Sequence, residues 1–300
     1  MRLSLRNLGK RYPNGHRAVA GLTLELSRGI VGLLGPNGAG KTTTLGMLAT
    51  TAQPTEGEIL VDGRPLRSVL RDYQRRLGYL PQHFELPALL EVHEVLEFMG
   101  GLCGLSCQEA RNRTDQLLET VGLARVRHRR VKHLSVGMTR RLGIAQSLVG
   151  DPDVLFVDEP TTGLDPEERN RFCSLLARLG REKTVVFSTH IVSDVEAVVS
   201  RVVVLDGGVL AYDGAPSGFV SRATGHVYRV LIAPEELEAL SRRHHLASVR
   251  EEDGRLCARI VIAGTPPPEA VPAEPTFEDA YLYHFRVLSG AEPRGLWTAA

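Results

Sequence analysis

Short apolar runs recur from the N-terminus to about residue 215, and segments of helical periodicity separate many of them. RLSLRNL opens the chain as a predicted strand before a turn at PNG, and further strands are predicted at LTLEL, IVGLLG, GEILVDG, VLFVD, TVVFST and RVVVLD. Helices are expected from Lys41 and at PEERNRFCSLLARLG and VSDVEAVVS. Strands that alternate with helices favour an α/β domain built on a parallel sheet.

The pattern becomes helical between residue 85 and about residue 150. Apolar residues recur at helical spacing in LLEVHEVLEFMGGLCGL, CQEARNRTDQLLETVGL and SVGMTRRLGIAQSLVG, with hardly a strand between them. The sequence therefore predicts an all-helical insertion within the α/β domain.

The pattern is less regular after residue 222. HVYRVLIA and LCARIVIAG are predicted strands on either side of a helix around PEELEALSRRHH, and TPPPEAVPAEPT is a proline-rich connection. FEDAYLYHF, residues 277 to 285, is expected to form an amphipathic helix. We predict one domain over residues 1–222 and a small accessory domain over residues 223–300.

The overall charge excludes a strong general attraction to nucleic acid. With 36 basic and 35 acidic residues the formal charge is +1, and 43% hydrophobic and 24% charged residues are typical of a globular protein. The densest basic segment, RVRHRRVKH at residues 125–133, lacks interleaved aromatic residues. We expect it to form a solvated face; the alternatives are contact with nucleotide, nucleic acid or anionic lipid, or with a partner subunit. We expect no nucleic-acid partner for the chain.

Neither a secretory signal nor a membrane span is expected. The N-terminal residues alternate between polar and apolar, and no window approaches the roughly 18 continuous apolar residues of a membrane helix. We therefore expect a cytoplasmic protein that would depend on another polypeptide for any membrane spans.

The four cysteines show no paired spacing. They are expected to be reduced thiols in or near the core: Cys103, Cys107, Cys173 and Cys257.

A glycine-rich loop, GPNGAGKT at residues 35–42, lies between a predicted strand and a predicted helix. Glycines let the backbone curl around phosphate oxygens, and the helix N-terminus that follows favours an anion. Lys41 is placed to reach the β- and γ-phosphates, and the Thr42 hydroxyl to bind Mg²⁺. The predicted nucleotide-binding residues here are Gly35, Pro36, Asn37, Gly38, Ala39, Gly40, Lys41, Thr42 and Thr43.

Two adjacent carboxylates follow the buried strand in VLFVDEP, residues 154–160. The carboxyl end of a parallel strand is where such sheets bind ligands, so Asp158 is predicted to hold the hydrated Mg²⁺ opposite Thr42. Glu159 is predicted to polarise the water that attacks the γ-phosphate.

Further motifs appear in a set order: LPQHF with Gln82, LSVGM at residues 134–138, TTGLD after Glu159, and FSTH ending at His190. This order resembles the ATP-binding cassette family, the ATPase subunits of ABC transporters, over roughly residues 1–222. The resemblance implies a P-loop NTPase cassette with a RecA-like core, an antiparallel β subdomain and the helical insertion, followed by the small accessory domain. It also implies ATP and Mg²⁺ as ligands.

The family's roles carry over to matching positions. Tyr12 resembles the aromatic residue that stacks on adenine. Gln82 resembles the glutamine that approaches the metal and the attacking water, in a loop that contacts the membrane subunit. His190 resembles the switch histidine at the γ-phosphate. The catalytic residues expected from the resemblance are thus Glu159, Gln82 and His190, and the metal ligands Thr42, Gln82 and Asp158.

The resemblance also implies a second cassette. In the family, the signature pentapeptide of the opposite monomer presents a serine hydroxyl and a glycine amide to the γ-phosphate, which here are Ser135 and Gly137. Asp165 resembles the aspartate of the loop that crosses between monomers. The chain should therefore pair with a copy of itself or with a relative.

The segments KRYPNGHRAVAGLTLEL and LSVGMTRRLGIAQSLVGDP and the EDAYL tail look most like the drug- and lipid-exporting branch of the family. In that branch the membrane permeases are encoded separately. We therefore expect an exporter subunit at the cytoplasmic face of a membrane. Two alternatives are a soluble cassette ATPase of translation or DNA repair, and a weakly hydrolysing regulatory module.

LSVGM departs from the usual pentapeptide, with Val136 replacing glycine and Met138 replacing glutamine. Both expected phosphate donors remain, and Val136 must point away from the nucleotide.

Overall fold

A computed structural model describes residues 1–252 and 254–290. The chain divides into two compact units, Met1–Asp213 and Gly214–Ala300. The boundary lies before the predicted one at 222/223 because α8 (Pro216–Val220) belongs to the second unit, where Phe219 packs against Phe277 with ring centroids 5.2 Å apart. The last ten residues of the predicted accessory domain lie outside the described residues.

The first unit is organised around a six-stranded sheet of order β10-β9-β3-β8-β7-β6. Neighbouring strands from β9 to β6 are parallel. The strands are β3 (Gly29–Leu34), β6 (Leu77–Leu80), β7 (Val154–Asp158), β8 (Thr184–Thr189), β9 (Arg201–Asp206) and β10 (Val209–Gly214). Every residue of β7 and β8 is buried, as expected for parallel strands covered on both faces.

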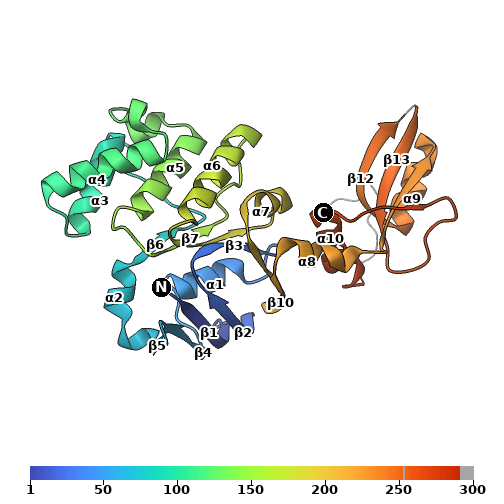
Figure 1. Cartoon of the computed structure of the whole chain (residues 1–300), viewed down its shortest axis with the longest axis horizontal. Coiled ribbons are helices and arrows are strands. Elements are labelled where there is room, and N and C mark those ends of the chain that lie inside the picture. The colour runs from blue at the N-terminus through green and yellow to red at the C-terminus, as the bar shows by residue number, and fades with distance from the viewer. Residues whose placement is uncertain (253, 291–300) are drawn as a thin grey trace. The chain divides into compact units, whose positions relative to one another are not determined.

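Successive residues of β7 enter two different cores. Leu155 packs with Leu176 of α6 (Pro166–Leu179) and with the helical insertion. Phe156 packs on the opposite face with Leu45 of α1 (Lys41–Leu48). In Figure 1, α5 and α6 accordingly lie on one side of the sheet and α1 on the other. Two helical layers thus hold the carboxyl ends of the strands in fixed positions.

A smaller antiparallel sheet of order β2-β1-β4-β5 covers the face that carries α1. Its strands are β1 (Leu3–Arg11), β2 (Arg17–Leu26), β4 (Glu56–Val61) and β5 (Arg64–Pro65). This sheet and the parallel core together confirm the predicted fold class, an α/β cassette with an antiparallel β subdomain.

The helical insertion lies between β6 and β7. It contains α3 (Val92–Leu102), α4 (Cys107–Thr120) and α5 (Val136–Ser147), with short 3₁₀ turns at Ala124–Val126 and Val131–His133. Ser106 caps α4 by accepting a hydrogen bond from the Glu109 N–H. A further short helix, α2 (Leu70–Arg75), precedes β6, and α7 (Val192–Val198) follows β8.

The second unit contains an antiparallel sheet of order β12-β13-β11-β14. Its elements are β11 (Val227–Ile232), α9 (Leu237–Arg243), β12 (His245–Glu252), β13 (Arg255–Val261), β14 (Val271–Pro272) and α10 (Phe277–Leu282), with a π-helical turn at Tyr283–Val287. The sequence did not predict β12. This edge strand is half-exposed along its length and ends in charged residues, so it lacks the apolar alternation of a buried strand.

Two expectations about composition have different outcomes. None of the described helices is long and apolar enough to cross a membrane. All four cysteines are free thiols, but Cys103 and Cys107 are exposed, so the expectation of core positions is wrong for these two. Cys103 is the C-cap of α3, and Cys107 is the first residue of α4.

A buried ion pair joins the sheet of the second unit to α10. The Arg259 Nε donates to both carboxylate oxygens of Asp279 at 2.9 Å, and the Asp279 side chain is almost fully buried. Burial alone would raise the pKa of Asp279, but hydrogen bonds from Arg259 and Thr276 outweigh it and hold that pKa below its usual value.

Replacing Asp279 with Asn should therefore destabilise the second unit by about 3 kcal/mol, because Arg259 loses its buried partner. The pKa of Asp279 is lower in the folded than in the unfolded state. Its contribution to stability is therefore complete above the unfolded-state pKa and is lost as the pH falls through the folded-state pKa. Hydrogen exchange of β13 amides, followed against pH, measures both effects. The exposed neighbour Glu278, changed to Gln, is the control, and equal protection in the two variants would contradict the assignment.

Candidate functional site

The loop between β3 and α1, residues 35–40, encloses a lysine side chain. Lys41 is the first residue of α1 and is only 4% exposed. Its Nζ donates to the carbonyl oxygens of Gly35 at 2.8 Å and Pro36 at 3.1 Å. Burial lowers the pKa of Lys41, and the nearby Glu159 carboxylate partly opposes that shift. The ammonium group is thus held inside the loop beside an acidic partner.

Two glycines of this loop have backbone conformations that other residues rarely adopt. Gly40, which precedes α1, has φ 95°, and a Cβ there would lie 2.4 Å from the Ala18 carbonyl oxygen. Gly38 has φ 83° and would meet nothing within 4 Å. Gly40 is therefore required by packing, whereas Gly38 leaves one side of the loop open to a ligand.

A serine hydroxyl connects the two acidic residues at the end of β7. Ser188 of β8 lies beside Asp158 in the parallel register, and its Oγ donates to Asp158 Oδ1 at 2.5 Å. The same Oγ accepts the Glu159 N–H at 2.9 Å. Glu159 has φ 44°, a conformation that costs a non-glycine residue on the order of 1 kcal/mol. Ser188 therefore holds Glu159 in the orientation that turns its side chain out of the sheet.

Several predicted site residues lie around the Glu159 carboxylate. Its Oε1 lies 3.4 Å from Lys41 Nζ. Its Oε2 accepts from Gln82 Nε2 at 3.2 Å and from Thr162 Oγ1 at 3.4 Å. The His190 Nδ1 lies 3.3 Å from the same oxygen, without hydrogen-bond geometry. The structure thus brings Lys41, Gln82 and His190 together around one buried carboxylate.

Asp158 offers an unused oxygen beside this cluster. The residue is completely buried, and its Oδ2 has no hydrogen-bond partner within the described part of the chain. A buried carboxylate oxygen without a partner is unfavourable unless a ligand satisfies it. Thr42, next to Lys41 at the start of α1, has an exposed side chain. Oxygen donors of this kind suit a hard cation such as Mg²⁺.

Tyr12 lies near the start of α1. It follows β1, where its backbone N–H donates to the His16 carbonyl oxygen at 2.9 Å. Its hydroxyl lies 3.3 Å from Thr43 Oγ1, the residue is 38% exposed, and the Lys10 Nζ lies 5.4 Å from the ring centroid. The ring is therefore close to the phosphate loop and accessible from solvent.

The residues expected to serve a second cassette lie at other helix N-termini. The Ser135 Oγ accepts the Met138 N–H at 3.2 Å and caps α5, and the Asp165 Oδ1 accepts the Glu168 N–H at 2.8 Å and caps α6. Within the described residues, no hydrogen bond or ion pair joins Ser135 or Asp165 to Glu159. In a single chain, both side chains serve their own helices.

The sequence did not predict the contact between these two helix starts. Glu168 of α6 packs on Gly137 of α5, where a Cβ would lie 2.3 Å from Glu168 Oε2. Arg141 of α5 lies 3.3 Å from the same oxygen. A side chain at position 137 would therefore displace the Glu168 carboxylate.

Asp194 of α7 is a second unpredicted residue of the site region. It is 1% exposed and accepts from Thr161 Oγ1 at 2.5 Å and from Thr189 Oγ1 at 3.3 Å. These bonds tie the loop after Glu159 to the end of β8. The aspartate lies four residues after His190, and the sequence did not single it out because α7 carries a second carboxylate, Glu196.

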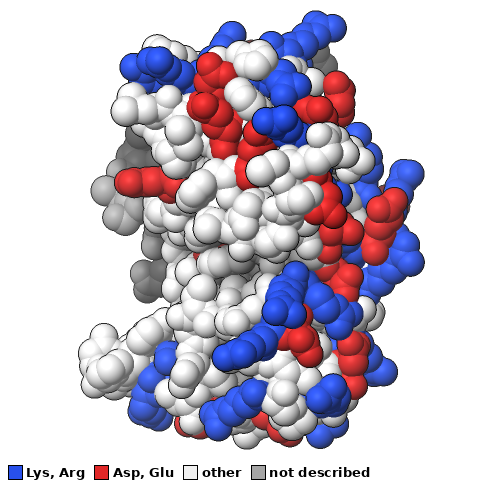
Figure 2. Space-filling view, turned by 90° about the vertical axis from the view of Figure 1, so that its left-hand side faces the viewer, with Lys and Arg blue, Asp and Glu red and all other residues white. Residues whose placement is uncertain are grey.

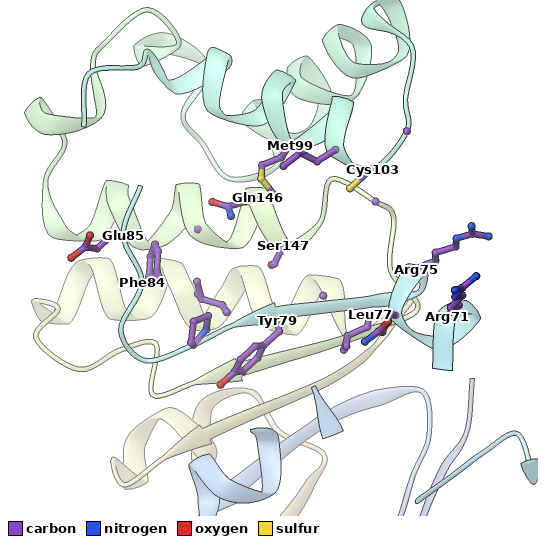
Figure 3. A pocket seen from close by; sticks show the side chains of 18 residues that line it. Arg71, Arg75, Leu77, Tyr79, Phe84, Glu85, Met99, Cys103, Gln146 and Ser147 are labelled. Carbon is purple, nitrogen blue, oxygen red and sulfur yellow. The ribbon is translucent and has the colours of Figure 1, made fainter. Parts of the chain in front are cut away.

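A groove lies between the parallel sheet and the helical insertion. Its cavity has a volume of about 810 Å³ and is lined by α2, β6, the Gln82 loop, α3 and α5. In Figure 3, Arg71 and Arg75 lie at one end, Phe84 and Glu85 at the other, and Met99 and Cys103 project from the helical side. Figure 2 shows a hollowed, largely uncharged band across this face, with basic side chains gathered beside it.

Comparison with known proteins agrees with this geometry. A family model described as "ABC transporter" matches residues 19–162. The Nod factor export ATP-binding protein I of Burkholderia orbicola (strain AU 1054) is 41% identical over 228 residues, which are 74% of each chain. The daunorubicin/doxorubicin resistance ATP-binding protein DrrA of Streptomyces peucetius is 38% identical over 77% of this chain and 70% of its own length.

Solved structures with the same fold include cbiO1 from Clostridium perfringens, part of the ABC transporter complex cbiONQ, with a TM-score of 0.67 and 28% identity over 72% of this chain and 89% of that one. Another is a dimeric post-hydrolysis state of the ATP-binding cassette MJ0796 bound to ADP and Pi, with a TM-score of 0.64 and 28% identity over 71% of this chain and 98% of that one. Together with the phosphate loop and the carboxylates around Lys41, these similarities show that the chain belongs to the ABC transporter family and is one of its ATP-hydrolysing subunits.

Proposed function

We propose that this chain hydrolyses ATP as a dimer of cassettes and thereby drives export by a separately encoded permease at the cytoplasmic face of a membrane. The observation that carries the proposal is the buried Glu159 carboxylate, which lies between Lys41 and Gln82 and directly after Asp158. Relatives named for export of Nod factors and for daunorubicin resistance support the transport role and do not favour a soluble translation or repair ATPase.

ATP is proposed to bind with its phosphates in the loop of residues 35–40. Lys41 would turn from Glu159 and the loop carbonyls toward the β- and γ-phosphates, and the amides at the start of α1 would complete the cradle. Tyr12 would stack on the adenine. The loop residues Gly35 to Gly40, with Lys41, Thr42 and Thr43, form the proposed binding set.

Thr42, Gln82 and Asp158 are the proposed ligands of Mg²⁺. The unpartnered Asp158 Oδ2 and the exposed Thr42 side chain fit this role. When bound, the ion neutralises charge on the β- and γ-phosphates.

Glu159 is the proposed general base. Once phosphate oxygens compete for Lys41, the Glu159 carboxylate is free to accept a proton from water on the far side of the γ-phosphate. Gln82 and His190, which already lie at Glu159 Oε2, would orient that water and contact the γ-phosphate. Phosphoryl transfer depends mainly on such positioning and on neutralised charge.

The opposite cassette would complete each site. Its Ser135 hydroxyl and Gly137 amide lie in the first turn of α5, where the helix dipole favours an anion. Asp165 would contact the partner across the interface. In this structure the Val136 side chain is 61% exposed and Met138 packs partly on the helical core, so neither occupies the place of the two donors.

The groove of Figure 3 is the proposed docking site for the permease. Arg71 and Arg75 are exposed, and within the described residues neither has an acidic partner. Exposed Leu102 and partly buried Phe84 add apolar surface. A short amphipathic helix with an acidic end over α2 would complement this surface.

The change Glu159→Gln should lower steady-state ATP hydrolysis by at least about 100-fold, the usual contribution of a general base, while leaving ATP binding intact. Because hydrolysis normally separates the cassettes, the variant should accumulate as an ATP-bound dimer, measured by light scattering. Lys41→Ala is the control that should lose nucleotide binding in calorimetry. Unchanged hydrolysis in Glu159→Gln would remove Glu159 from the role of base.

The docking site can be tested with the chain's own thiols. Cys103 lines the groove, whereas Cys107 is also exposed but does not line it. In membranes that contain the permease, maleimide labelling of Cys103 should slow because the partner covers it, and labelling of Cys107 should not change. Equal labelling of Cys103 with and without the permease would place the docking surface elsewhere.

A further inference from the structure

Two histidines and a glutamate gather at the start of α3, away from the nucleotide site. The Glu91 Oε2 lies 3.0 Å from His128 Nδ1 and 3.4 Å from His93 Nδ1. One ligand atom from each residue lies within 4.8 Å of the other two. Within the described residues, this is the one group of three or more His, Cys, Asp or Glu side chains with that spacing.

Main-chain hydrogen bonds hold the two contributing segments together. The Val92 N–H donates to the Arg129 carbonyl oxygen at 3.0 Å, and the Val131 N–H donates to the Leu90 carbonyl oxygen at 2.9 Å. The ring of His93 also contacts that of His128 edge to face, with centroids 4.9 Å apart. The three side chains therefore project from a fixed frame, so little ordering would be needed to bind a ligand.

The donor set and its spacing suit a transition-metal ion. Two imidazoles and one carboxylate are common ligands of Zn²⁺, with metal–ligand distances of about 2.0–2.2 Å. A tetrahedron of that radius has edges of about 3.3–3.6 Å. The measured separations from Glu91 Oε2, 3.0 and 3.4 Å, lie near this range, so small side-chain movements would bring the three atoms onto one ion.

Local charge also permits a cation there, although the segment is rich in arginine. The two histidines are the only basic side chains within 4.0 Å of the Glu91 carboxylate among the described residues. Arg127 is engaged by Asp115 at 2.9 Å. A second carboxylate, Glu94, accepts the Glu91 N–H at 2.7 Å and offsets the positive end of the α3 dipole.

We propose that Glu91, His93 and His128 bind a divalent transition-metal ion, with Zn²⁺ as the best match. Neutral Nδ1 atoms and the carboxylate would supply three ligands, and water would fill the remaining position. His93 would give up its contact to the Arg127 carbonyl oxygen, which lies 3.1 Å from His93 Nδ1. The ion would clamp the start of α3 to the basic segment that leads into α5. This binding does not depend on ATP hydrolysis.

The test uses the full-length chain freed of metal with a chelator, with Co²⁺ as a spectroscopic probe and Zn²⁺ in calorimetry. Co²⁺ should give visible absorption of a four-coordinate site that Zn²⁺ abolishes, with one ion per chain. His93→Ala, His128→Ala and Glu91→Gln should each weaken Zn²⁺ binding by at least about tenfold, since each removes a ligand. A rise in thermal stability with Zn²⁺ should vanish in the same variants.

His133→Ala is the matched control, because His133 is exposed, lies in the same basic segment and is absent from the cluster. Its Zn²⁺ affinity should equal that of the unmodified chain. A Cys103→Ser, Cys107→Ser double variant should also bind normally. The proposal is overturned if Zn²⁺ binding is absent, or if it survives in the three cluster variants or disappears with the two thiols. The residues would then form a hydrogen-bonded cluster only.

Discussion

The ion pair between Lys41 and Glu159 joins two buried charged side chains of the phosphate-loop region. Isolated charges are costly in a protein interior, so each of these groups depends on the other and on nearby polar atoms. The loop carbonyls of Gly35 and Pro36 satisfy the ammonium, and Gln82 and Thr162 satisfy the carboxylate. Removing either charge would leave the other unpaired, which explains why the loop, β7 and the Gln82 segment form one structural unit.

The parallel sheet makes this arrangement possible. β3, β7 and β8 end at the same edge, and their registers place Leu34 beside Thr189 and Asp158 beside Ser188. The fully buried strands leave no room for these ends to shift, because packed interiors accommodate displacement poorly. A single hydroxyl, that of Ser188, can then bond both the Asp158 carboxylate and the Glu159 N–H. The chemistry therefore depends on packing in two cores on opposite faces of the sheet.

The sequence predicted those parts of the site that belong to motifs with a fixed position relative to a strand or to one another. The loop before α1 and the carboxylates after β7 were visible because each follows a buried strand, whereas Gln82 and His190 were singled out only by the family resemblance. The structure places all of them near Glu159, and their individual roles stay predictions. Ser188 was missed because one serine in a buried strand leaves no periodic signal. Glu168 and Asp194 were missed because their partners lie far away in sequence or on another element. The edge strand β12 was missed because half-exposed strands mix polar and apolar residues.

The groove beside α2 and α3 has a consequence for selective inhibition. Family members share a common nucleotide, so a compound that competes at the phosphate loop would meet similar chemistry in many cassettes. The groove has a volume of about 810 Å³ and is lined by an exposed thiol, Cys103. A small electrophile that bonded to that thiol would act outside the phosphate loop. Selectivity would then come from the groove, which we propose as the docking site of the permease.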